Sequence, residues 1–98
     1  MKSTKSIISS GFKELEKYGF KVFNFNSNLK MRTKDFVDIV VVGKGKAYFI
    51  EVKIGKDTLS KGQQIAKQYF DTLSGYHIAT ENNYKEIIDA ILWTDNNA

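Results

Sequence analysis

The spacing of apolar residues along the chain changes between a helical repeat and the pattern of β-strands. Ile8, Phe12 and Leu15 recur at helical spacing, which predicts a first helix over residues 3–18 that ends at Gly19. The segments that follow are short and rich in β-branched or aromatic residues, as is typical of strands. We expect strands at residues 20–25, 36–42 and 47–54.

A second helix is predicted to begin at Ser60 and to end at Gly75. Its buried stripe is expected to comprise Ile65, Tyr69, Phe70 and Leu73. A short strand at 76–79 and an amphipathic helix over 84–92 follow. The order α-β-β-β-α-β-α indicates one α/β domain over residues 1–98, and the helical crossover favours parallel pairing of the last two strands.

The glycine-rich segment at 43–46 predicts a tight turn between the second and third strands. If Lys44 and Gly45 form the turn, every opposed pair in the hairpin has the same sum of residue numbers. Asp38 then lies opposite Glu51, and Lys53 shares their face because side chains alternate along a strand. Two carboxylates and one ammonium group are therefore expected on one face of this hairpin.

Most other residues of these two strands are apolar, so we expect both faces of the sheet to be largely covered. Opposed carboxylates repel one another, and burying them unpaired costs several kcal/mol or forces a raised pKa. A divalent cation bound by Asp38 and Glu51 removes this conflict, and the Val52 carbonyl is a candidate further ligand. The alternative is a structural salt bridge in which Lys53 neutralises the acids.

Composition excludes several classes of site. The 98 residues include no cysteine and one histidine, so disulfides and thiolate metal sites are excluded and a zinc site is not expected. No apolar run approaches the roughly 18 residues needed to span a bilayer, and no signal-peptide core is seen. We expect no membrane association, no nucleotide cofactor, and a location in the cytoplasm, or in the host cytoplasm if the protein is viral.

Charge is distributed unevenly along the chain. Residues 1–34 contain eight Lys or Arg against two Glu, whereas residues 35–98 contain seven Lys against nine acids. This asymmetry favours a polyanionic partner next to a local acidic site, although a solvated surface of a basic protein explains it equally well. The residues expected to contact a nucleic-acid backbone are Lys30, Arg32, Lys34 and Lys56.

Asp38 and the Glu51-Val52-Lys53 segment together resemble the core motif of PD-(D/E)XK nucleases. The segment Ile50–Lys53, then Gly55, then Leu59–Gln63 is similar to the VRR-NUC branch, which resembles Holliday junction resolvases. The resemblance covers roughly residues 7–80. It implies a restriction-endonuclease-like α-β-β-β-α-β core with a mixed sheet flanked by helices, to which this chain adds a C-terminal helix.

The resemblance implies a DNA endonuclease that uses Mg²⁺ or Mn²⁺ and selects branched DNA such as Holliday junctions or flaps. Asp38 and Glu51 then hold the metal, Lys53 assists catalysis, and Gln63 faces the site. The family often has a glutamate in the first helix, near Ser10 here, and Glu14 is the candidate substitute. Val37 stands where the family usually has proline, which carries no catalytic atom.

Alternatives remain at this stage. Ser60 and Gln63 form a capping-box pattern that needs no function. A catalytically inactive nucleic-acid-binding domain, a small interaction protein with a salt-bridged hairpin, and a site-specific homing or restriction nuclease are the other functional interpretations. One active site per chain makes a homodimer the expected state for coordinated cutting of two strands.

Overall fold

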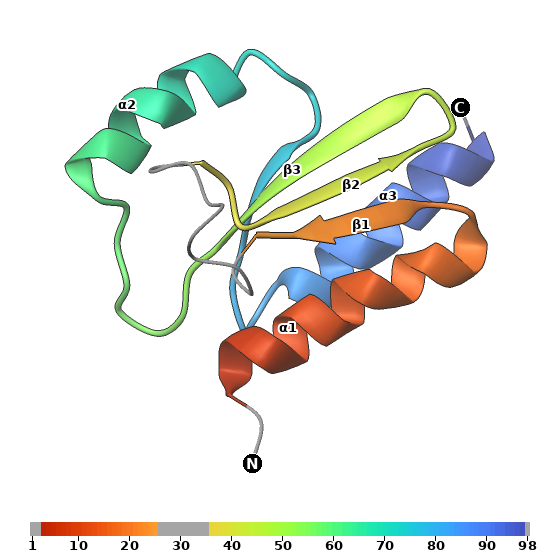
Figure 1. Ribbon diagram of the computed structural model, residues 1–98, viewed down its shortest axis with the longest axis horizontal. Helices are drawn as coiled ribbons and strands as arrows, with labels where there is room; N and C mark the ends of the chain where they lie inside the picture. Colours follow the sequence, from red (N-terminus) through yellow and green to blue (C-terminus); the bar gives the residue numbers. More distant parts are fainter. Residues whose placement is uncertain (1–2, 26–35, 98) are drawn as a thin grey trace.

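The computed structural model describes residues 3–25 and 36–97 and has an α/β architecture (Figure 1). The described part contains a four-stranded mixed sheet in the order β1-β2-β3-β4 and three α-helices. The strands are β1 (Lys21–Asn24), β2 (Ile39–Gly43), β3 (Lys46–Val52) and β4 (Tyr76–Ala79). The helical segments are α1 (Thr4–Lys13), the 3₁₀ turn η1 (Glu14–Tyr18), α2 (Lys61–Phe70) and α3 (Tyr84–Asn97). Pairing is antiparallel between β2 and β3 and parallel between β3 and β4, as predicted, and β1 pairs antiparallel with β2.

The first predicted helix is confirmed, with a change of geometry in its second half. The Ser3 hydroxyl caps α1 by accepting a hydrogen bond from the backbone N–H of Ser6 at 3.1 Å. The helix continues as the tighter 3₁₀ turn η1, which ends at Gly19. The φ of Gly19 is 95°, which suits a residue without a Cβ.

The hairpin of β2 and β3 has the predicted register. Lys44 and Gly45 both have positive φ, 57° and 80°, as a two-residue type I′ turn requires. Gly43 pairs with Lys46 and Ile39 pairs with Ile50, so the constant sum of residue numbers holds along the ladder.

One face of the sheet carries the hydrophobic core. Helices α1 and α3 lie across this face (Figure 1), and alternate strand residues point toward them. The core comprises Ile8, Phe12, Leu15, Phe20, Val22, Ile39, Val41, Tyr48, Ile50, Val52, Ala79, Ile87 and Ile91. The apolar positions that predicted the first helix, Ile8, Phe12 and Leu15, therefore all lie in the core.

The opposite face is covered only in part. Phe70 of α2 packs on Phe49 and Tyr76, with ring centroids 5.5 Å apart in each pair. Phe23 and Val42, on the same face, are 44% and 41% exposed. The expectation that both faces are covered is therefore wrong for the half of this face that α2 does not reach.

The predicted buried stripe of the second helix is also wrong. Helix α2 has no buried residue, and Ile65, Tyr69 and Leu73 are 53%, 75% and 45% exposed. Of the predicted stripe only Phe70 packs on the sheet, and Gln63, two turns away on the same side of the helix, also faces it. None of the described helices is long and apolar enough to cross a membrane.

Candidate functional site

Asp38 is buried at the point where β2 begins, with 1% of its surface exposed. Its backbone N–H donates to the carbonyl of Ile50 at 3.1 Å, and its own carbonyl accepts from Phe25 N–H at 2.8 Å. The carboxylate oxygen Oδ2 accepts a hydrogen bond from the backbone N–H of Val52 at 2.8 Å. The Asp38 side chain is therefore fixed beside the end of β3.

Glu51 lies on β3 at the same end of the hairpin and is only 3% exposed. Gln63 donates from Nε2 to Glu51 Oε1 at 3.2 Å, and Lys53 Nζ donates to Gln63 Oε1 at 2.9 Å. Lys53 Nζ also lies 3.8 Å from Glu51 Oε1, with 16% of the lysine side chain exposed. The amide of Gln63 thus contacts both charged residues of the Glu-x-Lys segment.

Gln63 both caps α2 and contacts the charged residues Glu51 and Lys53. The Ser60 hydroxyl accepts from Gln63 N–H at 3.1 Å, and Gln63 Oε1 accepts from Ser60 N–H at 2.9 Å, which completes a capping box. The same Oε1 atom accepts from Lys53. Gln63, in the first turn of α2, therefore both completes the capping box and contacts the lysine.

Tyr76 belongs to this region, although the sequence analysis did not single it out. Burial raises the pKa of Tyr76 to about 12, and the charges of Glu51, Asp71 and Asp38 raise it further. Its phenol therefore stays protonated at neutral pH, where it is a donor within the field of both acids. The signal was present in the sequence: parallel pairing places Tyr76 beside Phe49, two residues from Glu51 on the same face.

The donor set suits a hard divalent cation. Asp38 and Glu51, when ionised, carry two negative charges against one positive charge on Lys53. A strand residue directs its N–H and its C=O toward the same neighbouring strand, so the Val52 carbonyl faces the side on which Asp38 lies. Mg²⁺ is commonly held by one or two carboxylates while keeping several waters, which this pair of acids can satisfy.

Glu14 does not join this group. Its carboxylate pairs with Lys17 at 3.2 Å, and its side chain is 63% exposed. The described residues contain no cluster of three or more His, Cys, Asp or Glu side chains that could hold a metal. The prediction for Glu14 is wrong because the first helix packs on the core face of the sheet, whereas Glu51 lies on the opposite face.

The expected DNA-contacting residues have different outcomes. Lys30, Arg32 and Lys34 lie outside the described residues, so their role stays a prediction. Lys56 is exposed in the loop after β3, three residues beyond Lys53. Its position leaves the ammonium group accessible to a polyanion.

The fold and site define an α/β protein with two buried acids, a lysine and an orienting glutamine at one end of a hairpin. No family model matches the chain, and comparisons with curated proteins and with solved structures give no match either. Functional inference therefore depends on the geometry of the site.

Proposed function

We propose that the protein is a Mg²⁺- or Mn²⁺-dependent DNA endonuclease of the PD-(D/E)XK type, with its active site at Asp38, Glu51 and Lys53. The observation that carries this proposal is the burial of two acids at one end of a hairpin, beside a lysine that a glutamine orients. The element order helix, three strands, helix, strand supports the restriction-endonuclease-like core implied by the sequence. The cytoplasm stays the expected location.

In the proposed hydrolysis of a phosphodiester, the residues of the site have different roles. Asp38 and Glu51 are positioned to hold the metal, with the Val52 carbonyl as a further candidate ligand. The bound metal supplies a Lewis acid for the phosphoryl oxygen and a water of lowered pKa. Lys53 places positive charge where the phosphate becomes more negative, and Gln63 keeps that ammonium group aligned.

The direct test is cleavage of matched DNA substrates. We expect the protein to cut a four-way junction or a flap faster than a linear duplex of the same sequence, and only with Mg²⁺ or Mn²⁺ present. Contacts to phosphates rather than to base edges would make cleavage salt-sensitive and largely independent of sequence. Preferential cutting of one duplex sequence would instead favour a homing or restriction nuclease, and no cutting of any substrate would contradict the proposal.

A catalytically inactive nucleic-acid-binding domain is the second candidate. It is favoured by the structural hydrogen bonds that Asp38 makes to Val52 and that Gln63 makes to Glu51. These bonds can satisfy buried carboxylates without a metal.

Calorimetry with Mn²⁺ separates these two candidates. We expect saturable Mn²⁺ binding near neutral pH, weakened at least about tenfold by Asp38→Asn because the substitution removes one anionic ligand. Glu14→Gln is the matched control, since its exposed carboxylate lies outside the site and its loss should leave the affinity unchanged. Absence of binding by the native protein would favour the inactive domain or a purely structural salt bridge.

A homodimer stays the expected state, because coordinated cutting of two strands needs two copies of the site. The exposed residues Ile65 and Tyr69 form an apolar stripe on α2 that a second copy could cover. We expect sedimentation equilibrium to show a dimer and Tyr69→Glu to shift it toward monomer. Trp93→Ser removes a comparably exposed aromatic from α3 and should have no such effect; a native monomer would contradict this prediction.

A further inference from the structure

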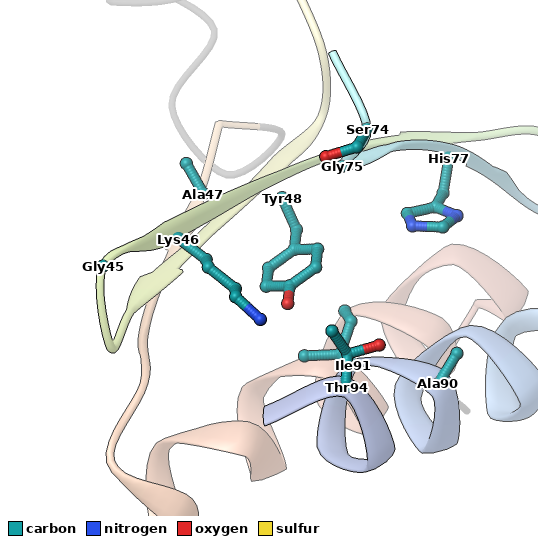
Figure 2. A pocket seen from close by; sticks show the side chains of 10 residues that line it. All are labelled: Gly45, Lys46, Ala47, Tyr48, Ser74, Gly75, His77, Ala90, Ile91 and Thr94. Atoms are coloured by element: carbon teal, nitrogen blue, oxygen red, sulfur yellow. The ribbon is translucent and has the colours of Figure 1, made fainter. Parts of the chain in front are cut away.

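A separate cavity of about 550 Å³ lies between the β3–β4 part of the sheet and α3 (Figure 2). The residues that line it are Gly45, Lys46, Ala47, Tyr48, Ser74, Gly75, His77, Ala90, Ile91 and Thr94. None of them belongs to the acidic site. Lys46 and Tyr48 alternate with Ala47 and Phe49 along β3, so they face α3, whereas Glu51 faces α2.

The local structure explains why space is left here. Strand β4 begins opposite Phe49, so Lys46 and Ala47 extend beyond it. At this end of the strand the carbonyl oxygen of Gly75 accepts a hydrogen bond from the backbone N–H of Phe49 at 2.9 Å. A Cβ at Gly75 would collide with the carbonyl oxygen of Ala47, so the chain needs glycine there. Small residues on both sides of the cavity keep it open.

Polar groups from three elements converge on this space. Figure 2 shows the side chains of Lys46, Tyr48 and His77 extending from the sheet toward Ile91 and Thr94 of α3. Among the residues that the structure describes, the lining contains one lysine, one histidine and the hydroxyls of Ser74 and Thr94, and no carboxylate side chain. Ammonium and hydroxyl groups donate hydrogen bonds to anionic oxygens.

The lining of the cavity favours a ligand in which the anionic group is attached to an organic ring. The rings of Tyr48 and His77 lie on the sheet side of the cavity, and Ala90 and Ile91 of α3 form the aliphatic side of its lining. Burial lowers the pKa of the half-buried His77, so its imidazole is neutral at pH 7 and can both donate and accept. The volume lies within the roughly 300–1,000 Å³ usual for small-molecule sites.

We propose that this cavity binds a small organic anion, with a phosphate or carboxylate group at Lys46 and a ring between the sheet and Ile91. The expected ligand carries one anionic oxygen group on a planar ring system. A nucleoside monophosphate and an aromatic carboxylate are the two sources to be distinguished. The proposal does not depend on nuclease activity, because the cavity and the acidic site share no residue.

The test is an NMR titration of the full chain with deoxyadenosine monophosphate, deoxyadenosine, benzoate and inorganic phosphate as separate probes. We expect saturable shifts at the imidazole of His77 and at the amides of Lys46 and Ala90 with the monophosphate or with benzoate. Whichever of these two binds more tightly identifies the anionic group that the site prefers. Deoxyadenosine and inorganic phosphate should bind at least about tenfold more weakly, because each lacks one half of the recognised structure.

Two variants of equal charge provide the control. Lys46→Ala should weaken binding of the organic anion at least about tenfold, since it removes a charge-assisted hydrogen bond. Lys44→Ala removes a neighbouring lysine that lies over the Phe20 ring and does not line the cavity, so it should leave binding unchanged. Equal weakening by both variants, equal affinity for inorganic phosphate, or no saturable shift with either organic anion would overturn the proposal.

Discussion

Replacing Glu51 with glutamine is expected to reduce metal-dependent DNA cleavage about a thousandfold, the upper range for loss of one electrostatic group in an active site. The new amide has nearly the shape of the carboxylate and can still accept the hydrogen bond that Gln63 donates at 3.2 Å. The substitution therefore removes the charge that we propose to hold the cation while leaving packing in place. Initial cleavage rates on the preferred DNA substrate measure the effect.

Two comparisons make that result specific to the site. Lys53→Met keeps the length of the side chain but removes its charge, and it should reduce cleavage about a hundredfold or more. Glu14→Gln removes an exposed carboxylate that pairs with Lys17 and should leave the rate unchanged. Native-like cleavage by both Glu51→Gln and Lys53→Met would remove the proposed active site from consideration.

Phe12→Ala is expected to lower the free energy of unfolding by about 3–5 kcal/mol. Phe12 is the largest fully buried side chain of the described residues, and it packs in the core between the sheet and the helices. Such a loss is a large share of the roughly 5–15 kcal/mol that stabilises a typical domain. Urea unfolding followed by circular dichroism measures the change.

Phe23→Ala is the matched control for this prediction. It removes the same ring from β1, where the residue is 44% exposed on the partly covered face of the sheet. We expect its cost to stay below about 1 kcal/mol, because the ring already contacts water. Equal losses in the two variants would show that the assignment of the core face is wrong.

The hairpin could be predicted from sequence because its rules are local. Two glycines flank Lys44 in the 43–46 segment, and a two-residue turn fixes the pairing of every residue beyond it. The same register brings Asp38 and Glu51 to one end of the ladder. To predict the Lys53–Gln63 contact, one must also know which side of the second helix faces the sheet.

The orientation of the second helix could not be predicted from the sequence. Hydrophobic periodicity selected the stripe of Ile65, Tyr69, Phe70 and Leu73, yet only Phe70 of these packs on the sheet, on the same side of the helix as Gln63. This orientation is held by the polar contact of Gln63 with Glu51 and by the ring contacts of Phe70 with Phe36, Phe49 and Tyr76. The polar contact has no signature in hydrophobic periodicity. Glu14 failed for a related reason, since helical spacing does not reveal which face of a sheet a helix will cover.

The double role of Gln63 couples helix formation to site assembly. Its Oε1 accepts hydrogen bonds from both Ser60 N–H and Lys53 Nζ, so unwinding the first turn of α2 also releases the lysine. Helix ends open locally at far lower cost than whole domains. If the site is catalytic as proposed, the fraction of molecules ready to react follows the fraying equilibrium of this turn. Any partner that clamps the start of α2 would then act as an activator without touching the acids.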